Sequence, residues 1–111
     1  TMRSGYTEKK MNGKVIALKF GTNAFCELCD MYGVEFYEMD KALKKPTGTR
    51  DLIFCAARMA ALSSGKKVTF NKYQIGDWLD DMTQDDYKDI LKAMNTTKII
   101  GREIDVKEES K

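Results

Sequence analysis

The chain has 111 residues, of which 42% are hydrophobic and 32% charged, and its formal net charge is +2. This length and composition are typical of one globular domain with a hydrophobic core, and they exclude a low-complexity chain. So small a net charge does not by itself indicate a nucleic-acid partner. The sequence has three cysteines and no histidine, which excludes Ser-His and Cys-His nucleophile pairs and most zinc sites. An odd cysteine count without an apolar signal segment indicates reduced thiols in a cytoplasm.

The N-terminal region has the pattern of a β-hairpin. Asn12-Gly13 is a strong turn signal, because both positions of such a turn need positive φ. The two-residue loop predicts the facing pairs Met11–Lys14, Lys9–Ile16 and Thr7–Leu18, with Ile16, Leu18 and Phe20 on one apolar face. The first strand, about residues 6–11, is polar and lysine-rich, which is typical of a solvent-exposed edge.

Two short helices are expected next. The first runs to Tyr32 after a cap at Thr22 or Asn23, and Gly33 ends it. Its apolar stripe comprises Phe25, Leu28, Cys29 and Tyr32. The second covers residues 36–44, with Phe36, Met39 and Leu43 directed inward, and residues 45–48 follow as a loop.

The segment over residues 51–64, DLIFCAARMAALSS, is predicted to form the central helix of the domain. Only Arg58 is charged between Leu52 and Leu62, and a helix that is apolar nearly all round is buried from several sides. Thr49 is expected to cap it, and Asp51 suits its first turn. This stretch of eleven residues is too short to span a membrane.

Two further helices are expected in the C-terminal half. Val68-Thr69-Phe70 is extended, and Asn71 with Gln74 forms a capping box for a helix over residues 72–81. Thr83 with Asp86 starts another helix, which ends near residues 95–97. The helical stripes are Ile75, Trp78, Leu79 and Met82, and then Tyr87, Ile90, Leu91 and Met94. The chain is therefore expected to be α+β and mainly α. One domain over residues 1–100 has a hairpin at about 5–20 packed on four to five helices, and a mobile polar tail covers 101–111.

No group of residues indicates catalysis, a cofactor or a metal, so we do not expect an enzyme. Cys26 and Cys29 form a CxxC, but inside a predicted helix rather than at the start of one. Cys29 and Cys55 fall on apolar stripes, whereas Cys26 falls off its stripe and is expected to be exposed. The aspartates near the last predicted helix lack the spacing of an EF-hand, and helix-start charge complementation explains Asp85 and Asp86.

The charges are unevenly distributed along the chain. Residues 1–20 are mostly basic, and residues 71–92 hold six aspartates, at positions 77, 80, 81, 85, 86 and 89. The basic and the acidic segment either attract each other between subunits, through the hairpin edge or the aspartate-rich helices, or form solvated faces. The candidate partner-binding residues are Lys9, Lys10, Met11, Trp78, Asp81 and Asp85. For Trp78, packing in the core is the alternative.

The order of these features resembles a known family. The segment MNGKVIALKFGTNAFCELCDMYGVEF joins the hairpin to a short helix of Cys, Glu and Leu and then to Gly33-Val34. The alanine-rich DLIFCAARMAAL and the helices with Trp78-Leu79 and Tyr87 follow. Together these features resemble the tail assembly chaperones of long, non-contractile-tailed bacteriophages and prophages. The resemblance covers roughly residues 6–96 and is best over 12–34.

The resemblance implies that the protein acts in the bacterial host cytoplasm and is absent from the mature virion. Its partners would be the helical tape-measure protein, which it keeps soluble, and the tail-tube protein. The resemblance also implies that a longer form made by ribosomal frameshifting can exist. Adaptable methionines suit a groove for an amphipathic helix, although the seven methionines equally suit a core. Two other classes remain open, namely a head–tail connector type of interaction protein and a nucleic-acid-binding regulator.

Overall fold

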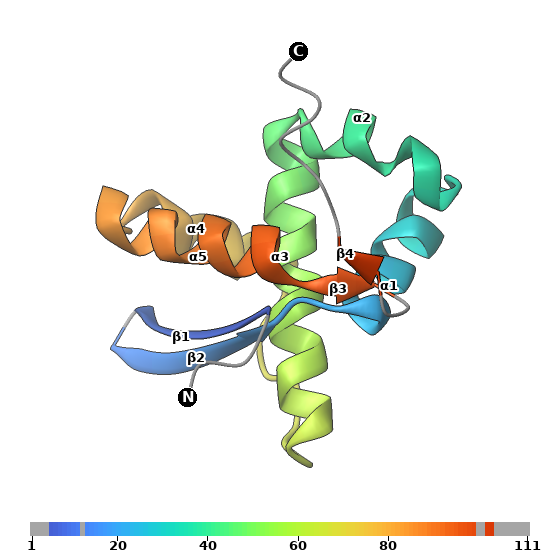
Figure 1. Cartoon of the computed structure of the whole chain (residues 1–111). Coiled ribbons are helices and arrows are strands. Elements are labelled where there is room, and N and C mark those ends of the chain that lie inside the picture. The colour runs from blue at the N-terminus through green and yellow to red at the C-terminus, as the bar shows by residue number, and fades with distance from the viewer. Residues whose placement is uncertain (1–4, 12, 100–101, 104–111) are drawn as a thin grey trace.

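The computed structural model describes residues 5–11, 13–99 and 102–103. Its elements are, in order, β1 (Tyr6–Met11), β2 (Lys14–Lys19), α1 (Thr22–Tyr32), the 3-10 turn η1 (Phe36–Glu38), α2 (Met39–Leu43), α3 (Pro46–Ser63), α4 (Lys72–Asp80), α5 (Gln84–Thr96), β3 (Lys98–Ile99) and β4 (Arg102–Glu103). The fold is α+β and mainly α, and an N-terminal hairpin lies on helices, as the sequence predicts (Figure 1). Within the described residues, no helix combines the length and the apolar character that a membrane span requires.

The hairpin has the predicted register, and its apolar face lies in the core. Met11 faces Lys14, Lys9 faces Ile16, and Thr7 faces Leu18. β2 packs on α3 and β1 contacts α5, so that β1 lies between β2 and α5 in Figure 1. The prediction of a solvent-exposed first strand is wrong in part, because α5 covers the inner face of β1.

Helix α3 is the central element, as predicted, and it contacts β2, α1, α2 and α4. Its single charge in the apolar stretch, Arg58, extends to α1, where Nη1 lies 2.7 Å from each carboxylate oxygen of Glu27. Leu52, Ile53 and Cys55 are fully buried. This helix therefore holds the hairpin and three helices in one core.

The start of α3 differs from the prediction. The expected loop at residues 45–48 is wrong, because α3 begins at Pro46, a residue whose fixed φ suits the first turn of a helix. Thr49 does not cap the helix; its hydroxyl donates to the carbonyl of Leu43 at 3.2 Å. Asp51 is consequently not in the first turn but buried, with a relative exposure of 2%. Gly48 is also buried and lies against the backbone of α2.

The segment before α3 has the predicted helices with different details. α1 covers the predicted range, but its N-cap residue is Gly21 rather than Thr22 or Asn23. Gly33 ends α1 in the left-handed conformation, with φ of 65°. The helix expected over residues 36–44 is divided into η1 and α2, and Phe36 is 51% exposed rather than directed inward.

The last two helices begin as predicted. Asn71 and Gln74 form the reciprocal capping box of α4, and the Thr83 hydroxyl accepts from the backbone N–H of Asp86 at 3.1 Å. α5 ends at Thr96 and leads into β3, which pairs with β4. The predicted tail over residues 101–111 lies outside the described residues, apart from Arg102 and Glu103 in β4.

Candidate functional site

Two adjoining hollows lie along α4 and α5. The first, which we call the α4–α5 groove, has a volume of about 510 Å³ and is lined by Leu79, Met82, Thr83, Gln84, Tyr87, Lys88 and Leu91. The second, the basic hollow, has a volume of about 520 Å³ and is lined by Lys44, Lys45, Pro46, Thr47, Thr49, Arg50, Gly76, Leu79, Asp80 and Tyr87. Leu79 and Tyr87 line both hollows, so the two form one continuous surface.

The groove is apolar because the core buries only part of the apolar stripe on each of its two helices. The remaining apolar side chains of each stripe line the groove. Ile75 of α4 and Ile90 of α5 are fully buried. Leu79 and Met82, which continue the stripe of α4, are only partly buried. Tyr87 in the first turn of α5 is 36% exposed. These side chains present a flexible thioether, a branched aliphatic chain and an aromatic ring to solvent, which suits an apolar partner.

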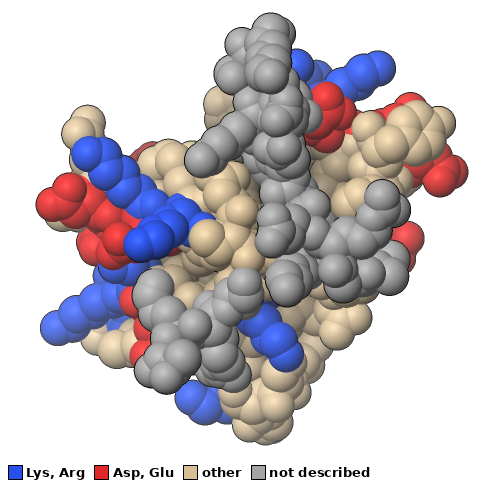
Figure 2. All heavy atoms as spheres, in the orientation of Figure 1, with Lys and Arg blue, Asp and Glu red and all other residues tan. Residues whose placement is uncertain are grey.

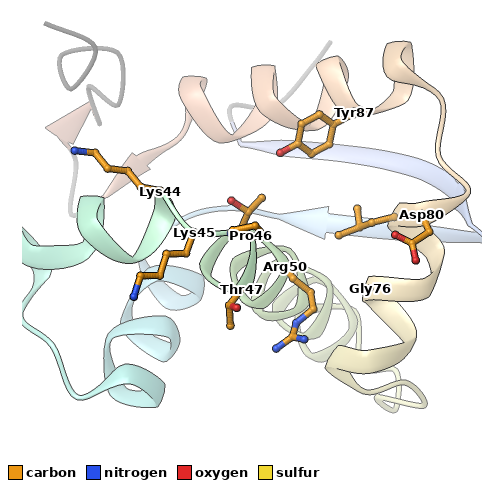
Figure 3. A pocket seen from close by; sticks show the side chains of 10 residues that line it. Lys44, Lys45, Pro46, Thr47, Arg50, Gly76, Asp80 and Tyr87 are labelled. Atoms are coloured by element: carbon orange, nitrogen blue, oxygen red, sulfur yellow. The ribbon is translucent and has the colours of Figure 1, made fainter.

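The basic hollow gathers positive charge where α3 begins. Lys44 and Lys45 come from the junction of α2 and α3, and Tyr87 points from α5 toward Pro46 (Figure 3). The positive end of the α3 macrodipole adds to these two cations. Arg50 is partly neutralised, because Nη2 lies 2.9 Å from a carboxylate oxygen of the buried Asp51. The hollow therefore favours acidic side chains at the end near α2, whereas Asp80 occupies the opposite end.

The structure places the sequence-predicted binding residues in different surroundings. Met11 is 2% exposed, so its selection as a binding residue is corrected to a core residue. Lys9 is mostly buried and forms ion pairs with Asp86 and Asp89 of α5. Lys10 is exposed on the hairpin, and Asp81 and Asp85 are exposed on either side of the α4–α5 turn.

Trp78 is partly buried and packs against the core, which is the alternative to a binding role for this residue. Its ring centroid lies 6.0 Å from that of Phe70, which in turn meets Phe54 edge-on at 6.1 Å. The sequence pattern predicts Leu79, Met82, Tyr87 and Leu91 as parts of core stripes, whereas in the structure they line the groove. The available signal was the width of those stripes, four positions on each of two short neighbouring helices.

Charges of both signs cover the end of the molecule where the hairpin tip and the ends of α4 and α5 lie. Figure 2 shows Lys and Arg side by side with Asp and Glu there, beside a broad uncharged surface. The hydrogen bond from Lys9 to Asp89 raises the pKa of the Lys9 amine and lowers the pKa of the Asp89 carboxyl. Lys9 of the basic N-terminal region thus offsets part of the negative charge of α5 within one chain.

The three thiols have the predicted placement. Cys26 is exposed, Cys29 packs against the core, and Cys55 is buried. Burial raises the pKa of the Cys55 thiol to about 12, so this group stays protonated at neutral pH. Among the described residues, no three His, Cys, Asp or Glu side chains form a group that could hold a metal ion.

Comparisons of the chain with models of protein families, with curated proteins and with solved structures find no match.

Proposed function

We propose that this protein is a tail assembly chaperone of a phage or prophage, and that it binds a helical segment of the tape-measure protein. The observation that carries the proposal is the apolar α4–α5 groove, which opens beside the cationic junction of α2 and α3. Amphipathic helices bind other proteins by placing their apolar face in a groove of this kind. Tail-tube assembly around the bound tape-measure protein is part of the proposed role, as is action in the host cytoplasm.

The lining of the groove suits a chaperone that must accept several similar segments. Met82 adapts to partners of different shape, and Tyr87 offers a rigid ring with a polar tip. Leu79 continues the surface into the basic hollow. Such a surface recognises the spacing of apolar side chains on a helix more than one particular sequence. The resemblance over residues 12–34 supports the same role from a separate part of the chain.

Charge gives the bound helix a direction. The cations Lys44 and Lys45 lie at one end of the surface, and Asp80 lies at the other end of the basic hollow. A helix with acidic residues near one end and a basic residue further along would match both. We also propose that several copies associate on one tape-measure protein, since a long helix offers repeated sites.

Co-expression tests the proposal. The tape-measure protein is produced in bacteria with this chain, with a Tyr87→Ala variant, or with an unrelated small helical protein, and its soluble fraction is measured. We expect the wild-type chain to raise solubility several-fold and Tyr87→Ala to lose most of that gain. No difference between this chain and the unrelated protein would refute the proposal.

Two further measurements separate the alternatives. Presence of this chain in purified virions would favour a head–tail connector type of role. A salt-dependent shift of DNA or RNA by the purified chain would favour a nucleic-acid-binding regulator, since contacts to phosphates weaken steeply as salt rises.

A further inference from the structure

A third hollow lies beside β2, away from the α4–α5 groove. It has a volume of about 390 Å³ and is lined by Tyr6, Glu8, Val15, Ile16, Ala17, Ala57, Ala60, Ala61, Ser64, Lys66, Lys67, Thr69 and Phe70. One wall is the hairpin, mainly β2 with Tyr6 and Glu8 of β1 beside it, and the other is the segment of residues 66–70 that follows α3. We call it the β2-edge groove. In Figure 1 this side of β2 faces the C-terminal half of α3 and not the helices α4 and α5.

The backbone of β2 has an open edge at this groove. In the part of the chain that the structure describes, β2 pairs with β1 alone. The backbone N–H of Phe20 donates to the carbonyl of Gly5 at 2.7 Å, which extends the register of the hairpin by one pair. Hydrogen-bonded and non-hydrogen-bonded residue pairs alternate in an antiparallel ladder. The next hydrogen-bonded pairs along β2 are therefore Thr7–Leu18 and Lys9–Ile16. The N–H and C=O groups of Val15 and Ala17 therefore point away from β1, along the open edge.

The floor of the groove leaves room for another backbone. Ala57, Ala60 and Ala61 of α3 lie there, and none of them carries atoms beyond Cβ. Long exposed strand edges are places where another extended chain adds by backbone hydrogen bonds. Val15 is 67% exposed and would meet an apolar side chain of an added strand.

The charges around the groove select its occupant. Lys66 and Lys67 line it. Lys19, the last residue of β2, has Nζ 3.2 Å from Oγ of Ser63, which precedes the lining residue Ser64. The carboxylate in the lining, that of Glu8, already accepts from the Tyr6 hydroxyl at 2.7 Å. The β2 strand of a second copy would bring Lys14 and Lys19 into a region that is already basic, whereas opposite charges across a strand pair stabilise it.

We infer that the β2-edge groove binds an extended, acidic segment of a partner polypeptide, which adds to β2 as a third strand. This site is separate from the α4–α5 groove and does not depend on the proposed chaperone role. Backbone hydrogen bonds to Val15 and Ala17 hold the segment, and the lysines select acidic side chains. The alanine floor accepts small or medium apolar side chains on its inner face.

A fluorescent peptide of eight residues, with glutamate alternating with valine, tests the inference by anisotropy. A peptide with lysine in place of glutamate is the probe of opposite charge. We expect the acidic peptide to bind at least about tenfold more tightly than the basic one. In Ala17→Pro, which lacks the outward N–H, we expect binding to weaken by about tenfold or more. Ala17→Val adds similar bulk and keeps the N–H, so its affinity should stay within about twofold of wild type.

If circular dichroism shows that Ala17→Pro does not fold, a second variant tests the inference. Lys66→Glu with Lys67→Glu changes two exposed residues, and we expect it to prefer the basic peptide. Tyr87→Ala, in the other groove, should bind the acidic peptide as wild type does. Equal binding of both peptides, or loss of affinity in Ala17→Val as large as in Ala17→Pro, would overturn the inference. So would a dimer of the free chain that Ala17→Pro dissociates, because the occupant would then be a second copy.

Discussion

Lys9 of β1 donates a hydrogen bond to the carboxylate of Asp89 in α5, 80 positions later in the chain. The same amine lies 3.4 Å from Asp86. Only 14% of the Lys9 side chain is exposed, because it leaves the inner face of the hairpin and passes along α5. This ion pair joins the first element of the fold to the last long helix, and it explains why a polar strand packs against the core.

Replacing Lys9 tests this connection. We expect Lys9→Met to keep the fold but to loosen the hairpin, because two carboxylates of α5 lose their cation. Amide hydrogen exchange in β1 should become faster, whereas exchange in α1 should change little. Lys10→Met removes an exposed lysine from the same strand and serves as the control. Equal exchange in the two variants would show that the ion pair does not hold the hairpin.

The same contact predicts a dependence on acid pH. The hydrogen bond from Lys9 lowers the pKa of the Asp89 carboxyl below its ordinary 3.8, so the folded state favours the carboxylate. This stabilisation is present above pH 3.8 and is lost as the pH falls through the lowered folded value. The difference in unfolding free energy between wild type and Asp89→Asn, from urea titrations, should therefore shrink between pH 7 and about pH 2.5. A constant difference across that range would contradict the assignment.

The fold followed from local signals, and the places where prediction failed have specific physical causes. Asn12-Gly13 determined the register of the hairpin, and the capping residues Asn71 and Thr83 correctly marked two helix starts. Proline is typical of loops but also suits the first turn of a helix, and Pro46 begins α3. The burial of Asp51 could not be predicted, because its hydrogen-bond partner Tyr32 belongs to another helix.

The Tyr32 hydroxyl donates to a carboxylate oxygen of the buried Asp51 at 2.7 Å, and Tyr32→Phe tests this contact. We expect the variant to lose about 1–3 kcal/mol of stability, since one oxygen of a buried carboxylate is left without a partner. Urea unfolding at neutral pH measures the loss. An unchanged midpoint and slope would show that the hydrogen bond contributes nothing.

Alkaline pH provides the control for the same pair. Burial and the hydrogen bond to Asp51 raise the pKa of Tyr32 from 10.0 to about 12. The folded state thus favours the neutral phenol, and the resulting stability is complete below pH 10 and is lost as the pH rises toward about 12. The difference in unfolding free energy between wild type and Tyr32→Phe should therefore become smaller above pH 10.

Two helical glycines give a matched pair of substitutions. A Cβ at Gly48 would lie 1.8 Å from the backbone carbonyl oxygen of Ala42, which cannot rotate away. We expect Gly48→Ala to destabilise the fold by about 1–3 kcal/mol or more, since the junction of α2 and α3 must separate. At Gly76 the nearest atom is Cδ of the flexible Arg50, at 3.3 Å. Gly76→Ala should therefore be neutral or stabilise by up to about 1 kcal/mol, because alanine favours helix. Thermal unfolding of both variants measures the difference, and equal effects would contradict the close contact at Gly48.

The candidate site was harder to predict than the fold. An apolar stripe in the sequence does not show which of its residues other helices bury and which stay at the surface. Met82 and Leu79 continue the stripe of α4 past the buried Ile75, and only the positions of α3 and α5 leave them at a surface. For Met11, by contrast, the sequence predicts an exposed edge, whereas the structure buries it in the core. Both errors concern long-range packing, which the spacing of residues along the chain does not determine.

The most direct test of the proposed role is the binding of this chain to purified helical segments of the tape-measure protein, measured by calorimetry. Tyr87→Ala removes the ring shared by the two hollows, and Tyr37→Ala removes a ring that is 79% exposed elsewhere on the surface. We expect saturable binding by wild type and Tyr37→Ala, with affinities within about twofold of each other, and a loss of about tenfold or more in Tyr87→Ala. No binding by the wild-type chain, or equal binding by all three proteins, would contradict the account.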